Sequence, residues 1–125
     1  MILVAEDDLC LRQSIDEVLT MMGYTTQTAS DGAEVVGLIN SGLDVSVILM
    51  DIEMPGMNGL EATRAIRSIE GVGRTVRIIG HTGRSGQDVI DACLAAGMNS
   101  VVTKGLLDDI LTCLSSEDGG QDPSG

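Results

Sequence analysis

The chain has 125 residues and a mass of 13.0 kDa, which fits one domain built around one continuous core. Its formal net charge of −12 repels polyphosphate, so direct binding to nucleic acid or to an anionic membrane surface is disfavoured. No apolar run approaches the roughly 20 residues that cross a bilayer. Tyr24 is the only aromatic side chain, which excludes a stacking platform for bases.

The amino terminus and the cysteines indicate a cytoplasmic chain. The first apolar run, Ile2–Ala5, has no basic segment ahead of it and ends in carboxylates, unlike an export signal. The three cysteines, Cys10, Cys93 and Cys113, are odd in number and lack the spacing of a metal site. We therefore expect reduced thiols that are buried as small apolar side chains.

Short apolar runs alternate with amphipathic stretches of helical period, which predicts five β-α units around a parallel sheet. The five strands are expected at Ile2–Ala5, Tyr24–Ala29, Val45–Met50, Val76–Gly80 and Val101–Thr103. Most of these runs lack polar alternation, as strands covered on both faces do. The run Tyr24–Ala29 is more polar, and we expect it at an edge of the sheet.

A stripe of apolar residues with a period of three to four predicts a first helix between Leu11 and Met22, ended by Gly23. Four more helices are expected at Ala33–Ile39, Leu60–Ile69, Val89–Ala96 and Leu107–Leu114. The domain is therefore expected to span residues 1–115. Residues 116–125 contain no aliphatic side chain and are expected to form a disordered acidic tail.

Carboxylates follow two of the predicted strands. Glu6 and Asp7 come after the first strand, and Asp51 comes after the third. In an open parallel sheet the ligand site lies beyond the carboxyl ends of the strands, so these acids are expected to meet there. Their mutual repulsion is relieved by a hard divalent cation, and Mg²⁺ suits a few carboxylates while keeping water ligands that a phosphate can displace.

Two more strand ends carry groups suited to phosphoryl transfer. Thr82 follows the fourth predicted strand and Lys104 follows the fifth. An aspartate attacks phosphorus to form an acyl phosphate, and the metal and a lysine balance the charge on the phosphoryl oxygens. Taken singly, each residue fits a plainer role, since an acid at a loop start is commonly a helix cap, as Asp8 is expected to be. Their order along successive strand ends favours the phosphoryl site.

Four segments together resemble the receiver domain of two-component response regulators, over essentially residues 1–114. The segments are Ile2–Asp8, Val47–Gly59, Ile78–Gly83 and Val101–Gly105. The separations of 31 residues from Asp51 to Thr82 and 22 from Thr82 to Lys104 also fit that family. Glu61–Arg67 and Gly97–Asn99 look most like receivers of hybrid sensor histidine kinases. The resemblance implies a flavodoxin-like doubly wound (βα)5 domain with strand order 2-1-3-4-5.

The resemblance also implies a set of metal ligands around the phosphoacceptor. Asp51 is then the phosphoacceptor, and Asp51, Asp7 and the main-chain carbonyl of Glu53 bind Mg²⁺, with Mn²⁺ as a substitute. Glu6 acts on the metal largely through water. Glu53, with Arg84, also occupies a position that in this family tunes attack of water on the acyl phosphate.

Further roles and the partners follow from the same resemblance. Thr82 is the switch hydroxyl and Lys104 the phosphate-binding ammonium. The phosphoryl donor is then a histidine kinase or a histidine phosphotransfer protein, and the domain is a monomer or a weak, phosphorylation-linked dimer. A receiver of this kind is a switch, active only in its own phosphorylation and dephosphorylation. Its downstream target is a protein of unknown identity.

Three positions depart from the family pattern. Gly105 stands where proline is usual, and Val101 where an inward-turning aromatic is common. His81, the only histidine, stands where a small or apolar residue is usual, between Gly80 and Gly83. With no Cys or His partner for a metal, His81 is expected on a mobile surface loop.

Three alternatives compete with a phosphorylated switch. The first is a receiver-like module that binds partners constitutively, which the changes at Val101 and Gly105 suggest. The second is a phosphatase of the haloacid dehalogenase type, which needs its paired acids at the first strand. The third is a flavodoxin-like electron carrier, whose cofactor phosphate the acids Glu6–Asp8 would repel. The intact set of acids, Thr82 and Lys104 favours the switch.

Overall fold

The computed structural model describes residues 1–84 and 86–104. Its elements in chain order are β1 (Ile2–Ala5), α1 (Leu9–Met21), β2 (Thr26–Ala29), α2 (Gly32–Asn40), β3 (Val47–Asp51), α3 (Gly59–Arg67), α4 (Val72–Thr75), β4 (Arg77–Thr82), α5 (Gln87–Ala96) and β5 (Ser100–Thr103). The strands form one parallel sheet in the order β2-β1-β3-β4-β5. The predicted fold and strand order are therefore confirmed. The predicted helix at 107–114 and the tail at 116–125 lie outside the described residues.

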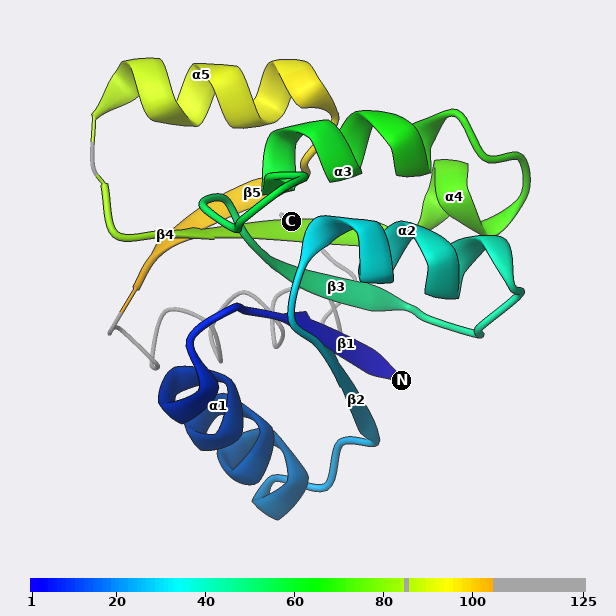
Figure 1. Cartoon of the computed structure of the whole chain (residues 1–125), viewed down its shortest axis with the longest axis vertical. Coiled ribbons are helices and arrows are strands. Elements are labelled where there is room, and N and C mark those ends of the chain that lie inside the picture. The colour runs from blue at the N-terminus through cyan, green and yellow to red at the C-terminus, as the bar shows by residue number, and fades with distance from the viewer. Residues whose placement is uncertain (85, 105–125) are drawn as a thin grey trace, which may run out of the picture.

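Helices cover both faces of the sheet, as the doubly wound pattern requires (Figure 1). On one face α2, α3 and α5 pack against a buried apolar cluster that includes Leu3, Ile48 and Ile78. On the other face α1 packs through Ile15 and Leu19. Because the two clusters use alternate residues of the same strands, β1, β3 and most of β4 are buried along their whole length.

Several strands begin or end one or two residues from the predicted boundaries. β2 pairs with β1 and lies at the end of the described sheet, which confirms it as an edge strand. β4 continues two residues past its predicted end, because His81 and Thr82 pair with Val102 and Thr103 of β5. Asp51 and Thr82 are thus the last residues of their strands, and Lys104 comes immediately after β5.

Local capping explains where the helices near the site begin. Asp8 caps α1 by accepting a hydrogen bond from the Leu11 amide at 3.1 Å, which confirms its predicted role. Asn58 and Glu61 form a reciprocal capping box at the start of α3. Gly23 follows α1 with a φ of 96°, which an L side chain rarely adopts. The caps at Asp8 and Asn58 hold the loops after β1 and β3 in place.

Arg67, at the end of α3, binds the chain segments that lead into β4 and β5, at the edge of the sheet where the strands begin. Its guanidinium donates to the carbonyls of Gly97, Gly73 and Val76 at 2.9, 3.1 and 2.7 Å. It also donates to Asn99 Oδ1 at 3.0 Å. The short helix α4, which no periodic pattern predicted, is attached to α3 through this side chain.

Replacing Arg67 with methionine is expected to lower the free energy of unfolding by about 3 kcal/mol, because three carbonyl groups lose a charged donor. The matched control is Arg64→Met, since Arg64 lies on the exposed side of the same last helical turn. Urea unfolding of both variants measures the difference. Equal stability of the two variants would contradict the role of Arg67.

Candidate functional site

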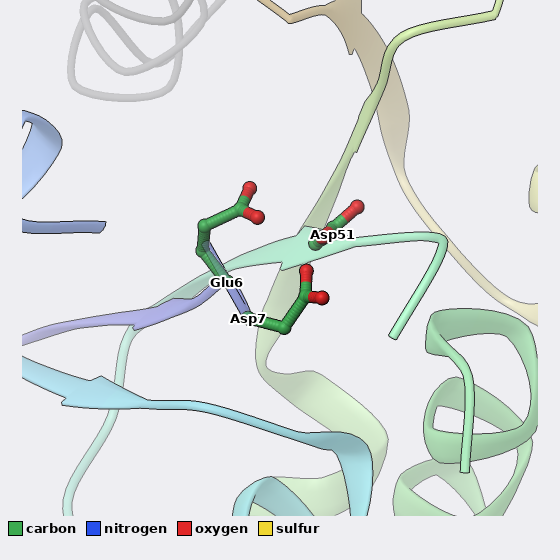
Figure 2. Close-up of side chains that lie close together, drawn as sticks. All are labelled: Glu6, Asp7 and Asp51. Atoms are coloured by element: carbon green, nitrogen blue, oxygen red, sulfur yellow. The ribbon is translucent and has the colours of Figure 1, made fainter. Parts of the chain in front are cut away.

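Three carboxylates meet at the carboxyl edge of the sheet (Figure 2). β1 pairs with β3 so that Ala5 lies beside Met50, which places Glu6 and Asp7 next to Asp51. One carboxylate oxygen from each of the three residues lies within 4.8 Å of the others. The prediction that Asp7 and Asp51, 44 positions apart in the sequence, lie close together is confirmed by this geometry.

The three acids differ in exposure. Glu6 is 1% exposed and Asp51 0%, whereas Asp7 is exposed at the mouth of the site. Oδ2 of Asp51 is buried and has no hydrogen-bond partner among the described residues. A buried carboxylate oxygen without a donor is costly unless a cation approaches it. The cluster therefore fits a hard divalent ion that prefers oxygen ligands.

The pKa values reflect this crowding of negative charge. Burial raises the pKa of Glu6 to about 7, and hydrogen bonding and charge repulsion from Asp51 add to the rise. Burial also raises the pKa of Asp51. Desolvation alone would raise the pKa of Asp7, but hydrogen bonds with the carboxyl groups of Asp51 and Glu6 outweigh it and lower the pKa. Asp7 is thus the acid that stays ionised most readily.

Lys104 supplies the positive charge of the site. Its Nζ lies 3.0 Å from Asp51 Oδ1 and 3.2 and 3.3 Å from the two oxygens of Glu6. Its main-chain amide donates to the Thr82 carbonyl at 2.7 Å, which places the side chain beyond β5. Desolvation opposes its charge, but the hydrogen bond and the attraction to Asp51 and Glu6 raise its pKa. Lys104 therefore carries its charge directly against Asp51.

Thr82 ends β4 and lines a cavity of about 200 Å³ between the loop after β3 and α5. Its hydroxyl accepts a hydrogen bond from the Arg84 amide at 3.0 Å. The hydroxyl proton remains free for an acceptor, since that bond uses only an oxygen lone pair. Thr82 is therefore placed as a donor, although its predicted switch role stays a prediction.

The position of His81 differs from the one expected from the sequence. The predicted surface loop is wrong, because His81 lies within β4 and is 1% exposed. Burial, and to a lesser extent the charge of Lys104, lower its pKa to about 4. The flanking glycines suggested a loop, but pairing with β5 extends the strand through this position.

The expectation for Cys10 is also wrong, since Cys10 is exposed, whereas Cys93 is buried as predicted.

Glu53 and Arg84 lie at the rim of the site. Arg84 Nε approaches Glu53 Oε2 to 2.8 Å, with both side chains more than half exposed. The amide of Glu53 donates to Asp51 Oδ1 at 3.1 Å and so orients the Asp51 carboxylate. The role of the Glu53 carbonyl as a metal ligand stays a prediction. Gly105 lies outside the described residues.

The sequence prediction missed two residues that hold the acids in place. Arg12 on α1 donates from Nη1 to the Glu6 carbonyl at 2.8 Å. Gly59 opens α3 so close to β3 that an added Cβ would lie 2.3 Å from the Asp51 carbonyl oxygen. No spacing rule identifies either residue. The contact of Gly59 depends on how α3 packs against β3, although a glycine opening a helix is a weak signal of such an approach.

Comparison with known protein families shows which family the chain belongs to. The family model described as response regulator receiver domain matches residues 2–113. The chain belongs to the response regulator receiver domain family. Within the described ranges, none of the helices of this receiver domain has the length and apolar character of a membrane span.

The relatives of this receiver domain include sensor kinases. It is 37% identical to the CAI-1 autoinducer sensor kinase/phosphatase CqsS of Vibrio cholerae over 110 residues, which are 88% of this chain and 16% of CqsS. It is 31% identical to the sensor histidine kinase RcsC of Escherichia coli over 111 residues, 89% of this chain and 11% of RcsC. The receiver domain thus spans less than a fifth of the length of these two relatives.

Solved structures agree on the fold. The receiver domain of sensor histidine kinase PA1611 of Pseudomonas aeruginosa, solved with a magnesium ion in its active site cleft, superposes with a TM-score of 0.81 at 33% identity. That match covers 93% of each chain. The chemotaxis protein CheY4 of Vibrio cholerae superposes with a TM-score of 0.84 at 25% identity, over 91% of this chain and 94% of CheY4.

Proposed function

We propose that this receiver domain is a signalling switch that accepts a phosphoryl group onto Asp51 in a Mg²⁺-dependent reaction. The observation that carries the proposal is the buried Asp51 carboxylate between two further acids and the Lys104 ammonium, 3.0 Å away. Asp7 and Asp51, with the Glu53 carbonyl, would hold the ion, and Glu6 would act largely through water. Mn²⁺ would substitute for Mg²⁺.

Each residue has one part in the transfer. A carboxylate oxygen of Asp51 attacks phosphorus, and the new O–P bond forms as the P–N bond of a phosphohistidine breaks. The donor ring, protonated beforehand on its other nitrogen, keeps the electron pair of the broken bond and leaves as neutral imidazole. Lys104 balances the charge on the phosphoryl oxygens, and the Thr82 hydroxyl donates a hydrogen bond to one of them. When bound, Mg²⁺ supplies positive charge that lets the crowded carboxylates stay ionised.

The donor would be a histidine kinase or a histidine phosphotransfer protein, and the output a change in binding to a protein target. The sensor kinases among the relatives support this class of donor. The net charge of −12 supports protein partners over nucleic acid. We place the switch in the cytoplasm as a monomer or weak phosphorylation-linked dimer, with a folded domain that ends near residue 115.

Acetyl phosphate and intact-mass spectrometry test the proposal. With Mg²⁺ the chain is expected to gain one phosphoryl mass increment, and chelation of the metal or Asp51→Asn is expected to abolish the gain. Asp44→Asn is the matched control, because Asp44 is an exposed aspartate on the loop before β3. This variant is expected to gain the same increment as the unsubstituted chain.

The contrary result is also informative. If neither acetyl phosphate nor a phosphorylated histidine phosphotransfer protein adds mass, the switch is excluded. The receiver fold would then serve constitutive protein binding. An adduct that persists in Asp51→Asn would show instead that a different residue accepts the phosphoryl group.

A further inference from the structure

His81 is a buried polar side chain that the proposed chemistry does not use. It pairs in register with Asp51 on β3 and with Val102 on β5, so it lies in the middle of the site edge of the sheet. Its side chain is 2% exposed, and Nδ1 lies 3.9 Å from Glu6 Oε1. Among the residues that the structure describes, Nε2 has no hydrogen-bond partner. A buried imidazole aimed at an acidic cluster calls for a role beyond core packing.

Glu6 depends on a small number of donors. Its Oε2 accepts from the Asp8 amide at 3.1 Å, and both of its oxygens lie near Lys104 Nζ, at 3.2 and 3.3 Å. Lys104 is shared, because the same Nζ lies 3.0 Å from Asp51. On the side of Oε1, His81 is the second basic side chain in reach.

Phosphoryl binding would change this sharing. Under the proposed function, Lys104 turns from Glu6 to a phosphoryl oxygen on Asp51. The carboxylate of Glu6 is 1% exposed, so water does not readily replace the ammonium that it loses. Oε2 keeps the hydrogen bond from the Asp8 amide, but Oε1 is left without a donor, and a buried carboxylate oxygen in that state is strongly disfavoured. The imidazole of His81 closes the gap to Oε1 with an approach of roughly 1 Å, which brings it to ordinary hydrogen-bond length.

We propose that His81 is a positioning residue whose Nδ1–H donates a hydrogen bond to Glu6 Oε1 and holds that carboxylate toward the metal site when Lys104 engages the phosphoryl group. The inference rests on the proposed function and adds a residue to it. The proton on Nδ1 leaves Nε2 as an unprotonated nitrogen, and this avoids an orphaned buried N–H. His81 is 1% exposed, and burial disfavours a charged imidazolium, so the ring donates as a neutral group and does not repel a divalent cation.

Magnesium affinity tests the inference directly. The dissociation constant for Mg²⁺ is measured by calorimetry with beryllium fluoride present as a mimic of the phosphoryl group. His81→Leu is expected to weaken Mg²⁺ binding about tenfold, as loss of a partner behind a metal ligand commonly does. His81→Asn, whose amide nitrogen replaces Nδ1, is expected to restore the affinity to within about twofold of the unsubstituted domain. His81→Gln, which replaces Nε2, is expected to stay weak.

A spectroscopic signature separates positioning from packing. His81 is the only histidine, so ¹⁵N NMR of the ring reports on one side chain. The protonated nitrogen is expected to be Nδ1, and its signal is expected to shift when Mg²⁺ and beryllium fluoride are added. If His81→Leu does not fold, the difference in Mg²⁺ affinity between His81→Asn and His81→Gln tests the inference instead.

Three results would overturn the inference. One is an Nε2-protonated ring that does not respond to Mg²⁺ and beryllium fluoride. Another is an unchanged Mg²⁺ affinity in His81→Leu while the unsubstituted domain binds Mg²⁺ and is phosphorylated, which leaves the proposed function intact. The third is an unsubstituted domain that binds no Mg²⁺, which removes the proposed function and this inference together.

Discussion

Replacing Gly59 with alanine is expected to destabilise the receiver domain by about 3 kcal/mol, although alanine is the better helix former by about 1 kcal/mol. An added Cβ would lie 2.3 Å from the Asp51 carbonyl oxygen and 2.9 Å from Ile52 Cα. Both neighbours are main-chain atoms, in the last residue of β3 and in the residue after it, so no flexible side chain can move aside. The start of α3 must therefore move away from Asp51.

Gly37→Ala is the matched control for this prediction. Gly37 lies inside α2, and an added Cβ there meets nothing within 4 Å. This variant is expected to gain about 0.5–1 kcal/mol. Chemical unfolding measures both variants, and the rate of phosphorylation by acetyl phosphate reports whether Asp51 has moved. If both alanines raise stability equally, the close approach of α3 to β3 has no energetic consequence.

Replacing Lys104 with methionine is expected to slow phosphorylation of Asp51 by about 100-fold, the size of effect that follows loss of one preorganised positive donor. The methionine keeps the apolar stem and removes only the ammonium that lies 3.0 Å from Asp51 Oδ1. Arg74→Met is the control, since Arg74 is an exposed cation on α4. Initial rates of mass gain from acetyl phosphate measure both variants. An unchanged rate in Lys104→Met would exclude the charge-balancing role.

The same variant carries a stability change with a defined dependence on pH. Burial raises the pKa of Glu6 to about 7 and also raises that of Asp51, so the fold favours the protonated form of both. Stability from such groups is fully present below their unfolded pKa values and is lost as pH rises through the folded ones. Without Lys104 the folded values rise further. Lys104→Met is therefore expected to unfold at a lower temperature than the unsubstituted domain at pH 7.5, and the gap is expected to narrow at pH 5.

The sequence was sufficient to predict the sheet and the place of the acids. Apolar runs without polar alternation identify strands buried on both faces, and β1, β3 and β4 confirm this. Parallel strands bring their carboxyl ends to one edge, and the juxtaposition of Glu6, Asp7 and Asp51 follows from that rule alone. The four segments at the strand ends carried the family resemblance, which the family match over residues 2–113 confirms.

Contacts between distant segments were not predictable in the same way. Gly80 and Gly83 made His81 look like part of a loop, since glycines mark turns when they are considered locally. Pairing of β4 with β5 overrides that local signal and buries the ring against Glu6. The bonds from Arg67 to Gly97, Gly73 and Val76 likewise depend on where the chain returns after α3.

By itself, therefore, the sequence determined the layers and the identity of the acids, because these follow from local periodicity and from the residues at the strand ends. The strand order came from the family resemblance. Tertiary structure alone decided which of those groups are buried and what each one faces. Exposure and pKa depend on neighbours from several elements, as the difference between buried Glu6 and adjacent exposed Asp7 shows. Such neighbours are set by packing in space, which no single stretch of sequence encodes.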